Sequence, residues 1–214
     1  MKKVKPKMSV KRKLANTAYI LLTVVLIALY VVPTVQIDIS GIGNFFGSLN
    51  FGGSRTKLAY QVDSANKACQ ITGIGRYKEA ELIIPSVISG NRVTSIGDSA
   101  FYYCTNVKSV AIPYTVNIIG NYAFTTCHDL ESAQMDYGVQ KIGICLFMSC
   151  RKLKTVTIPA SVNYIGQFAF YDCPELTAIH FGGTMQRWNE ISHDTYWNQN
   201  NNRCVVYCSD GTLK

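Results

Sequence analysis

The chain contains eight cysteines, which could form disulfides, and three histidines, which together with the cysteines could bind a metal ion such as zinc. A structural zinc site needs two pairs of such ligands that converge on the ion. The sequence offers one Cys-x-x-x-Cys pair, Cys204 and Cys208, and its histidines are scattered. On one extended strand these two cysteines would lie about 13 Å apart, too far to bond to each other. We therefore predict no metal site and no bond between this pair.

Two short stretches contain the letters of catalytic and cofactor motifs. Ser192, His193 and Asp194 are the residue types of a hydrolase triad, but a triad is assembled from distant segments, so a polar loop is the better interpretation. Gly73-Ile74-Gly75 lacks the helix and the further glycine of a dinucleotide-binding loop, which favours a turn. We expect no catalytic residue and no cofactor.

The spacing of four cysteines indicates an internal repeat. Cys104, Cys127, Cys150 and Cys173 follow one another at intervals of 23 residues, and four further columns keep the same interval. A repeat of this length predicts stacked units rather than an ordinary globular core. The further columns are Ile96, Ile119, Ile142 and Ile165; Gly97, Gly120, Gly143 and Gly166; Phe101, Phe124, Phe147 and Phe170; and Val107, Leu130, Leu153 and Leu176.

Each unit divides into two halves. Leu153–Pro159 has the apolar spacing of a short strand and ends at a proline. Because one unit cannot bury its apolar face alone, copies should stack and pair their strands. The sequence thus predicts an α/β repeat, a right-handed solenoid with parallel strands on one flank and short helices on the other. The helical half is inferred from four residues spaced like one face of a helix of two turns or fewer, Ile165, Ala169, Phe170 and Cys173.

The column of four cysteines is predicted to be a structural part of this stack. Neighbouring strands lie about 4.8 Å apart, so adjacent cysteines come near disulfide distance, but their side chains point in parallel. A buried free cysteine behaves as a small hydrophobe. We therefore favour reduced cysteines between helix and strand over a disulfide framework, and leave Cys69 and Cys145 unassigned.

The recurring pattern L-x-x-[VI]-x-I-P-x-x-V-x-x-I-G-x-x-A-F-x-x-C resembles the BspA-type leucine-rich repeat family, found on surface proteins of host-associated bacteria and some protozoa. The resemblance covers about residues 56–208. The sequence departs from the family pattern in the third copy, at Asp136, Gly138 and residues 144–146. The resemblance implies that the fold is a right-handed leucine-rich-repeat solenoid and that its setting is the cell surface.

The N-terminal segment has the layout of a membrane anchor. A basic tail, residues 1–17, precedes an apolar span, residues 18–37, and the first acidic residue is Asp38. A span of roughly 20 residues crosses a bilayer as a helix, and no small-x-small cleavage site follows, so a signal-anchor is favoured over a signal peptide. The basic flank stays inside. We expect a single-pass plasma-membrane protein with its repeats outside, or a secreted one if the helix is cleaved.

The rest of the chain divides into a linker, two caps and the repeats. The first copy carries a five-residue insertion around Ser89–Arg92. In the C-terminal cap we expect a helix with Thr184 as N-cap and Trp188 and Ile191 facing inward, then a strand and an Asp-Gly turn. The predicted boundaries are 38–55 for a Gly- and Ser-rich linker, 56–80 for N-terminal cap strands, 81–181 for the repeats and 182–214 for the C-terminal cap.

The net charge of +8 does not indicate a nucleic-acid partner. Seven of the 21 basic residues precede residue 14, and from Asp38 onward 14 basic residues accompany 13 acidic ones. A nearly neutral folded part does not offer the basic groove that a nucleic-acid binder uses.

Two surfaces remain as candidates for binding a protein or a glycan. Outward residues of the predicted strands are mostly small and uncharged and form a strip, which a solvated face without function would explain equally well. Tyrosines outside the core columns are the second candidate, because tyrosine brings a large contact area at low entropic cost. The strip comprises Glu81, Ile83, Ser109, Ala111, Ser132, Gln134, Thr155, Thr157, Ala178 and His180. The aromatic set comprises Tyr102, Tyr103, Tyr114, Tyr122, Tyr137, Tyr164 and Tyr171.

These observations together predict a non-enzymatic binding or adhesion module displayed outside the membrane. A structural spacer or envelope component without a specific ligand is the alternative.

Overall fold

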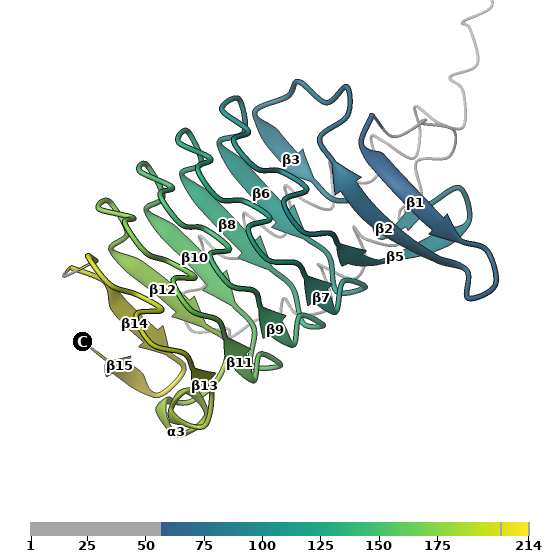
Figure 1. Cartoon of the computed structure of the whole chain (residues 1–214). Coiled ribbons are helices and arrows are strands. Elements are labelled where there is room, and N and C mark those ends of the chain that lie inside the picture. The colour runs from purple at the N-terminus through teal and green to yellow at the C-terminus, as the bar shows by residue number, and fades with distance from the viewer. Residues whose placement is uncertain (1–56, 202, 214) are drawn as a thin grey trace, which may run out of the picture. The chain divides into compact units, whose positions relative to one another are not determined.

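The computed structural model describes residues 57–201 and 203–213, and every strand within them belongs to one of two sheets that line a stack of rungs (Figure 1). The predicted basic tail, signal-anchor and linker lie outside the described residues. Among the residues that are described, no helix is long and apolar enough to span a bilayer.

The seven-stranded sheet is parallel except for its last pair, β14 and β15, which is antiparallel. Its register repeats from rung to rung, so that Thr155 lies opposite Ser132 on one side and Ala178 on the other. The strand half of each predicted unit is therefore confirmed. The strands are β3 (Glu81–Ile83), β6 (Ser109–Ile112), β8 (Ser132–Met135), β10 (Thr155–Ile158), β12 (Ala178–Phe181), β14 (Val205–Cys208) and β15 (Gly211–Leu213).

The second sheet has eight strands; β1 and β2 lie in the segment predicted as N-terminal cap strands, residues 56–80, but a second sheet along the repeats was not predicted. Its central strands are only two residues long and pair in parallel, while β1 with β2 and β4 with β5 form antiparallel hairpins. The β4–β5 hairpin turns at Ser89 and Gly90 and contains the insertion of the first copy. The strands are β1 (Ala59–Asp63), β2 (Ala68–Gly73), β4 (Val87–Ile88), β5 (Asn91–Ile96), β7 (Ile118–Ile119), β9 (Lys141–Ile142), β11 (Tyr164–Ile165) and β13 (Ser192–His193).

The predicted helical half of each unit is wrong. Two residues between the glycine and the cysteine of each rung have a positive φ, Tyr122 and Thr126 in one rung, and a right-handed helix cannot contain them. The backbone N–H groups of Tyr122 and Phe124 donate to carbonyls of the next rung, whereas that of Thr125 donates within its own turn. Each rung therefore turns through hydrogen-bonded bends, and only α3 (Met185–Asn189) is a helix in the described part of the chain.

The core lies between the two sheets and contains the predicted columns. The four phenylalanine rings form a continuous stack, with centroids 4.9, 5.6 and 5.6 Å apart from Phe101 to Phe170, and all four are fully buried. Aromatic pairs of this kind contribute about 0.5–1.5 kcal/mol each beyond their buried area. The isoleucines that precede the repeat glycines, such as Ile142, are buried beside them.

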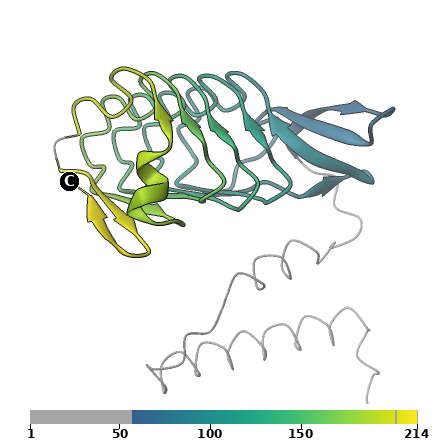
Figure 2. The ribbon, with the colours of Figure 1, turned by 90° about the horizontal axis from the view of Figure 1, so that it is seen from below.

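The C-terminal cap contains the predicted elements. Thr184 caps α3 by accepting a hydrogen bond from the N–H of Arg187, and Trp188 and Ile191 are buried. Figure 2 shows α3 at the C-terminal end of the stack and the hairpin of β1 and β2 at the other end. Strands β14 and β15 meet at the expected Asp-Gly turn, where Asp210 accepts a hydrogen bond from the N–H of Met185.

The cysteines of the repeat column are free, buried and act as hydrogen-bond donors. The Sγ of Cys127, Cys150 and Cys173 each donates to the carbonyl of the phenylalanine one rung earlier, at 3.0 to 3.1 Å. Burial raises the pKa of Cys173 to about 12, so this thiol stays protonated at neutral pH. Within the described residues the Sγ of Cys104, at the start of the column, has no such acceptor.

This difference can be measured by removing one thiol at a time. Cys150→Ala removes one of the two donors to the Phe124 carbonyl, the other being the N–H of Cys127, and should lower the free energy of unfolding by about 0.5–1.5 kcal/mol. Cys104→Ala removes the same sulfur atom without breaking a thiol–carbonyl hydrogen bond. It should therefore lower the free energy of unfolding clearly less. Urea unfolding of both variants under reducing conditions measures the difference, and equal losses would contradict the donor role.

The repeat glycines allow neighbouring rungs to approach each other. A Cβ added at Gly143 would lie 2.8 Å from the carbonyl oxygen of Gly120, closer than atoms can approach without movement of the backbone. At Gly97 the nearest atom to an added Cβ is the carbonyl oxygen of Ile71, at 3.3 Å. The inner glycines are therefore required by close packing, more strictly than the first of the column.

Alanine substitution should rank the two positions in that order. Gly143→Ala forces two rungs apart, and overpacking of this kind costs about 1–3 kcal/mol. Gly97→Ala needs the neighbouring atoms to move by only a few tenths of an ångström, so it should destabilise the protein less. Thermal unfolding followed by circular dichroism tests this ranking, which the reverse order would refute.

Candidate functional site

The predicted strip lies on the outer face of the seven-stranded sheet. Ala111, Gln134, Thr157 and His180 are neighbours in register, and the row continues to Ile83 at one end and Tyr207 at the other. The rings of His180 and Tyr207 stack with centroids 5.2 Å apart. The structure thus brings the residues of this row together as one continuous surface.

The second row of the strip is less open. Ser109, Ser132 and Thr155 are half-buried, and Ala178 is only 9% exposed. The expectation that Ala178 faces solvent is wrong. Its small methyl group lies beside the larger, branched side chain of Val205 on β14.

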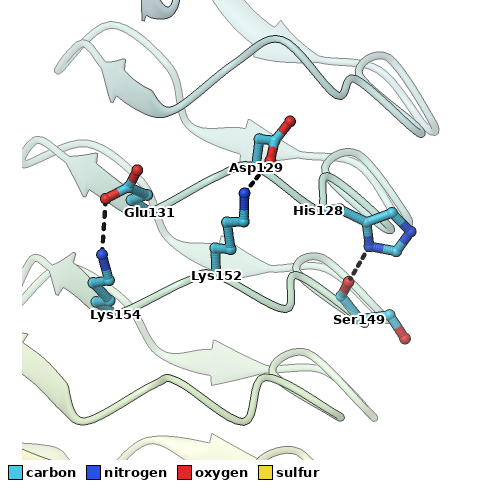
Figure 3. A network of polar contacts seen from close by, with 6 residues as sticks. All are labelled: His128, Asp129, Glu131, Ser149, Lys152 and Lys154. Atoms are coloured by element: carbon cyan, nitrogen blue, oxygen red, sulfur yellow. Dashed lines mark hydrogen bonds and ion pairs between the residues drawn. The ribbon is translucent and has the colours of Figure 1, made fainter.

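Paired charges border the strip along the bends that lead into its strands. Lys152 contacts Asp129 at 2.7 Å and Lys154 contacts Glu131 at 2.9 Å, each across one rung (Figure 3). The hydrogen bond from each lysine lowers the pKa of its carboxyl partner. Because the charges compensate one another, this border offers no field of one sign to a charged ligand.

The seven predicted tyrosines do not form one surface. Tyr114 and Tyr137 lie in the turns that follow β6 and β8, and Tyr164 lies on β11, where its hydroxyl donates to Asp194. The other four occupy the hydrogen-bonded bends between the glycine and the cysteine of each rung. We call these bends the turn edge, defined as residues 98–103, 121–126, 144–149, 167–172 and 195–200, which contain Tyr102, Tyr103, Tyr122 and Tyr171.

Two aromatic residues that the sequence analysis missed, Phe168 and Tyr196, complete the turn edge. Their rings lie parallel, 8° apart in orientation, with centroids 5.8 Å apart. Tyr171 contacts Phe168 edge to face at 5.3 Å. These three residues, with Met148 and Gln199, line a cavity of about 390 Å³.

The cavity depends on a further rung that the sequence analysis assigned to the cap. Asn201 takes the place of a column cysteine, because its side-chain amide donates to the carbonyl of Phe170 while its oxygen accepts from the N–H of Cys173 at 2.9 Å. The N–H of Phe170 donates to the carbonyl of Trp197, as in the rungs before. This rung places Tyr196 beside Phe168. An amide 28 residues after Cys173 was the available signal, hidden by its departure from the 23-residue interval.

An aromatic cluster holds this last rung in place. The ring of His193 lies 5.5 Å from Trp188 and 5.0 Å from Trp197, measured between centroids. Trp197 also contacts Phe170 of the core stack at 6.0 Å. The Nε2 atom of His193 is buried without a hydrogen-bond partner, and burial lowers the pKa of this histidine.

The arrangement of the last rung excludes a Ser-His-Asp triad at these positions. Ser192 and His193 form β13, with the imidazole of His193 among tryptophan rings, and Asp194 accepts from Tyr164. In the part of the chain that the structure describes, no cluster of three or more His, Cys, Asp or Glu side chains could hold a metal ion.

Acidification should loosen the last rung. Because the folded state depresses the pKa of His193, the stability it supports is intact above the ordinary histidine pKa of about 6.5 and falls as the pH drops below that value. His193→Phe keeps an aromatic ring there but cannot be protonated. The difference in thermal midpoint between wild type and variant, measured from about pH 8 to about pH 5.5, should change with pH, and a constant difference would contradict the assignment.

Two sheets whose repeat strands pair in parallel, a continuous phenylalanine stack and a column of cysteine or asparagine donors define a leucine-rich-repeat solenoid. The chain belongs to the BspA type leucine rich repeat family, whose model matches residues 72–202 in six copies. A comparison with curated proteins finds no match.

Solved structures of bacterial leucine-rich repeat proteins are similar to this chain. One from Bacteroides ovatus has a TM-score of 0.56 and 26% identity, over 71% of this chain and 40% of its own. One from Bacteroides capillosus has a TM-score of 0.53 and 25% identity, over 61% of this chain and 98% of its own. The T. pallidum leucine rich repeat protein TpLRR has a TM-score of 0.49 and 25% identity, over 62% of this chain and 73% of its own.

Proposed function

We propose that the solenoid is a non-enzymatic binding module that recognises a protein or a glycan. The observation that carries this proposal is the exposure of large aromatic side chains on one edge of a molecule whose core is complete. On the turn edge, Tyr102 is 56% exposed, Tyr103 is 58% exposed and Tyr196 is 53% exposed. Tyrosine is enriched where proteins bind partners, since its ring buries well and its hydroxyl finds a hydrogen bond.

The outer strip is the second surface that supports this function. Its row from Ala111 to His180 keeps one register from strand to strand and carries no lysine, arginine or carboxylate, so a partner can approach the sheet without displacing long charged side chains. Its bordering ion pairs are satisfied within the chain. A ligand at the strip would therefore be recognised by shape and by uncharged hydrogen-bonding groups.

We further propose that the module is displayed outside the plasma membrane on a single N-terminal helix, or is secreted if that helix is cleaved. The support is the sequence order of a basic tail, an apolar span of residues 18–37 and a Gly- and Ser-rich linker. In this setting the turn edge and the strip would both be accessible to partners from outside the cell.

The test is a binding screen with the full-length chain in mild detergent against arrays of purified extracellular proteins and glycans. Three aspartate variants are compared for any saturable ligand found. Tyr103→Asp alters the turn edge at a left-handed position that aspartate tolerates, and Thr157→Asp alters the strip. Asn163→Asp, on an exposed position outside both surfaces, is the matched control.

We expect Tyr103→Asp or Thr157→Asp to weaken binding about tenfold or more, because a buried unpaired carboxylate opposes an interface. Asn163→Asp should leave the affinity unchanged. A screen without any saturable ligand, or a ligand indifferent to both surface variants, would favour a structural spacer instead.

A further inference from the structure

The aromatic cavity at the turn edge combines features that the fold alone does not require. Phe168 and Tyr196 occupy left-handed backbone positions, with φ of 56° and 60°. Bulky side chains are rare there, and glycine or asparagine would fit with less strain. In the same position of the other rungs stand Ser99, Tyr122 and Cys145, so the turn itself does not need an aromatic ring.

The rings define a surface on which a ligand can lie. At 5.8 Å between centroids, Phe168 and Tyr196 are in direct contact, so nothing can enter between them. Tyr171 is turned 77° from Phe168, which gives the cavity aromatic walls in two orientations, and Met148 adds an adaptable apolar contact. The volume of about 390 Å³ is at the lower end of the range for small-molecule sites.

The polar groups of the cavity indicate the chemistry of the ligand. Among the described residues that line it, none is charged, so no opposite charge is available for an anionic or cationic ligand. The amide of Gln199 and the hydroxyls of Tyr171 and Tyr196 can each donate and accept. A ligand that matches them needs hydroxyl groups, which also do both, and apolar C–H faces that can lie against the rings.

We propose that this cavity binds a neutral carbohydrate, whose sugar ring packs against Phe168, Tyr171 and Tyr196 while its hydroxyls bond to Gln199. A pyranose ring has both required features, C–H groups on its faces and hydroxyls at its rim. The inference rests on the proposed binding function and specifies one ligand class for one of its two surfaces. The exposed position of the cavity on a repeating edge leaves room for a longer glycan to continue along neighbouring rungs.

The test uses glycine substitutions, because glycine suits a left-handed backbone and removes the ring without straining the turn. Phe168→Gly and Tyr196→Gly take away the walls of the cavity. Ser89→Gly is the control, since Ser89 has a φ of 50°, is exposed in the turn between β4 and β5, and belongs to neither the turn edge nor the strip. Circular dichroism and thermal unfolding check that all three variants remain folded.

The full-length chain, in a detergent without a sugar headgroup, is titrated calorimetrically with neutral hexasaccharides of glucose, mannose and galactose. A heparin-derived hexasaccharide and a proline-rich peptide serve as anionic and peptide probes. We expect saturable binding of at least one neutral hexasaccharide, weakened about tenfold or more by Phe168→Gly and Tyr196→Gly and unchanged by Ser89→Gly.

Absence of binding to every neutral hexasaccharide, or binding that the two cavity variants leave intact, would overturn the proposal. Cavity-dependent binding of the heparin fragment or of the peptide alone would overturn it as well. In the last case the broader binding function stands while the carbohydrate assignment fails. If the array screen finds no saturable ligand at all, both the broader binding function and the carbohydrate assignment fail.

Discussion

The structure depends on the hydrogen bonds that join each rung to the next. Along the turn edge, alternate N–H groups donate to the following rung, as Tyr122 does to Ile144 and Phe124 does to Leu146, and those between them close bends within the rung. Buried backbone groups must all be paired. This requirement fixes the rung length and forces two residues per rung into the left-handed region. It also makes the inner glycines necessary, because a Cβ atom at Gly143 would lie only 2.8 Å from the carbonyl oxygen of Gly120.

The same constraint explains why the cysteine column is not a disulfide framework. The bends leave a buried phenylalanine carbonyl in each rung. From Phe101 to Phe147 this carbonyl accepts from the N–H of the cysteine in its own rung and from the thiol one rung later. Asn201 serves the last of these carbonyls with an amide instead. Cysteine and asparagine are thus interchangeable here as small side chains that donate inward. Oxidation of any pair would remove these donors from buried acceptors, which stabilises the thiol form.

Much of this fold could be predicted from the spacing of apolar residues, but the sign of φ could not. The offsets of Ile165, Ala169, Phe170 and Cys173 are compatible with a short helix and with the observed bend, because both bring these side chains to one face. Strand alternation, with a period of two, placed the outward row from Ala111 to His180 correctly. The cavity was missed because Phe168 and Tyr196 are 28 residues apart and the rung that aligns them departs from the 23-residue interval.

Position on the turn edge also determines what the exposed aromatic rings can do. On the inner rungs, each bend has backbone hydrogen bonds to both neighbouring rungs, so a side chain on it stands on a fixed backbone and binding costs less entropy. The bend of the last rung is hydrogen-bonded to the preceding rung, and there Trp197, next to Tyr196, also packs against Phe170 of the core stack. The aromatic wall at the C-terminal end is therefore held more rigidly than an exposed loop would be. Sites of this kind, on rigid elements supported by a packed second layer, are the ones that bind with defined geometry.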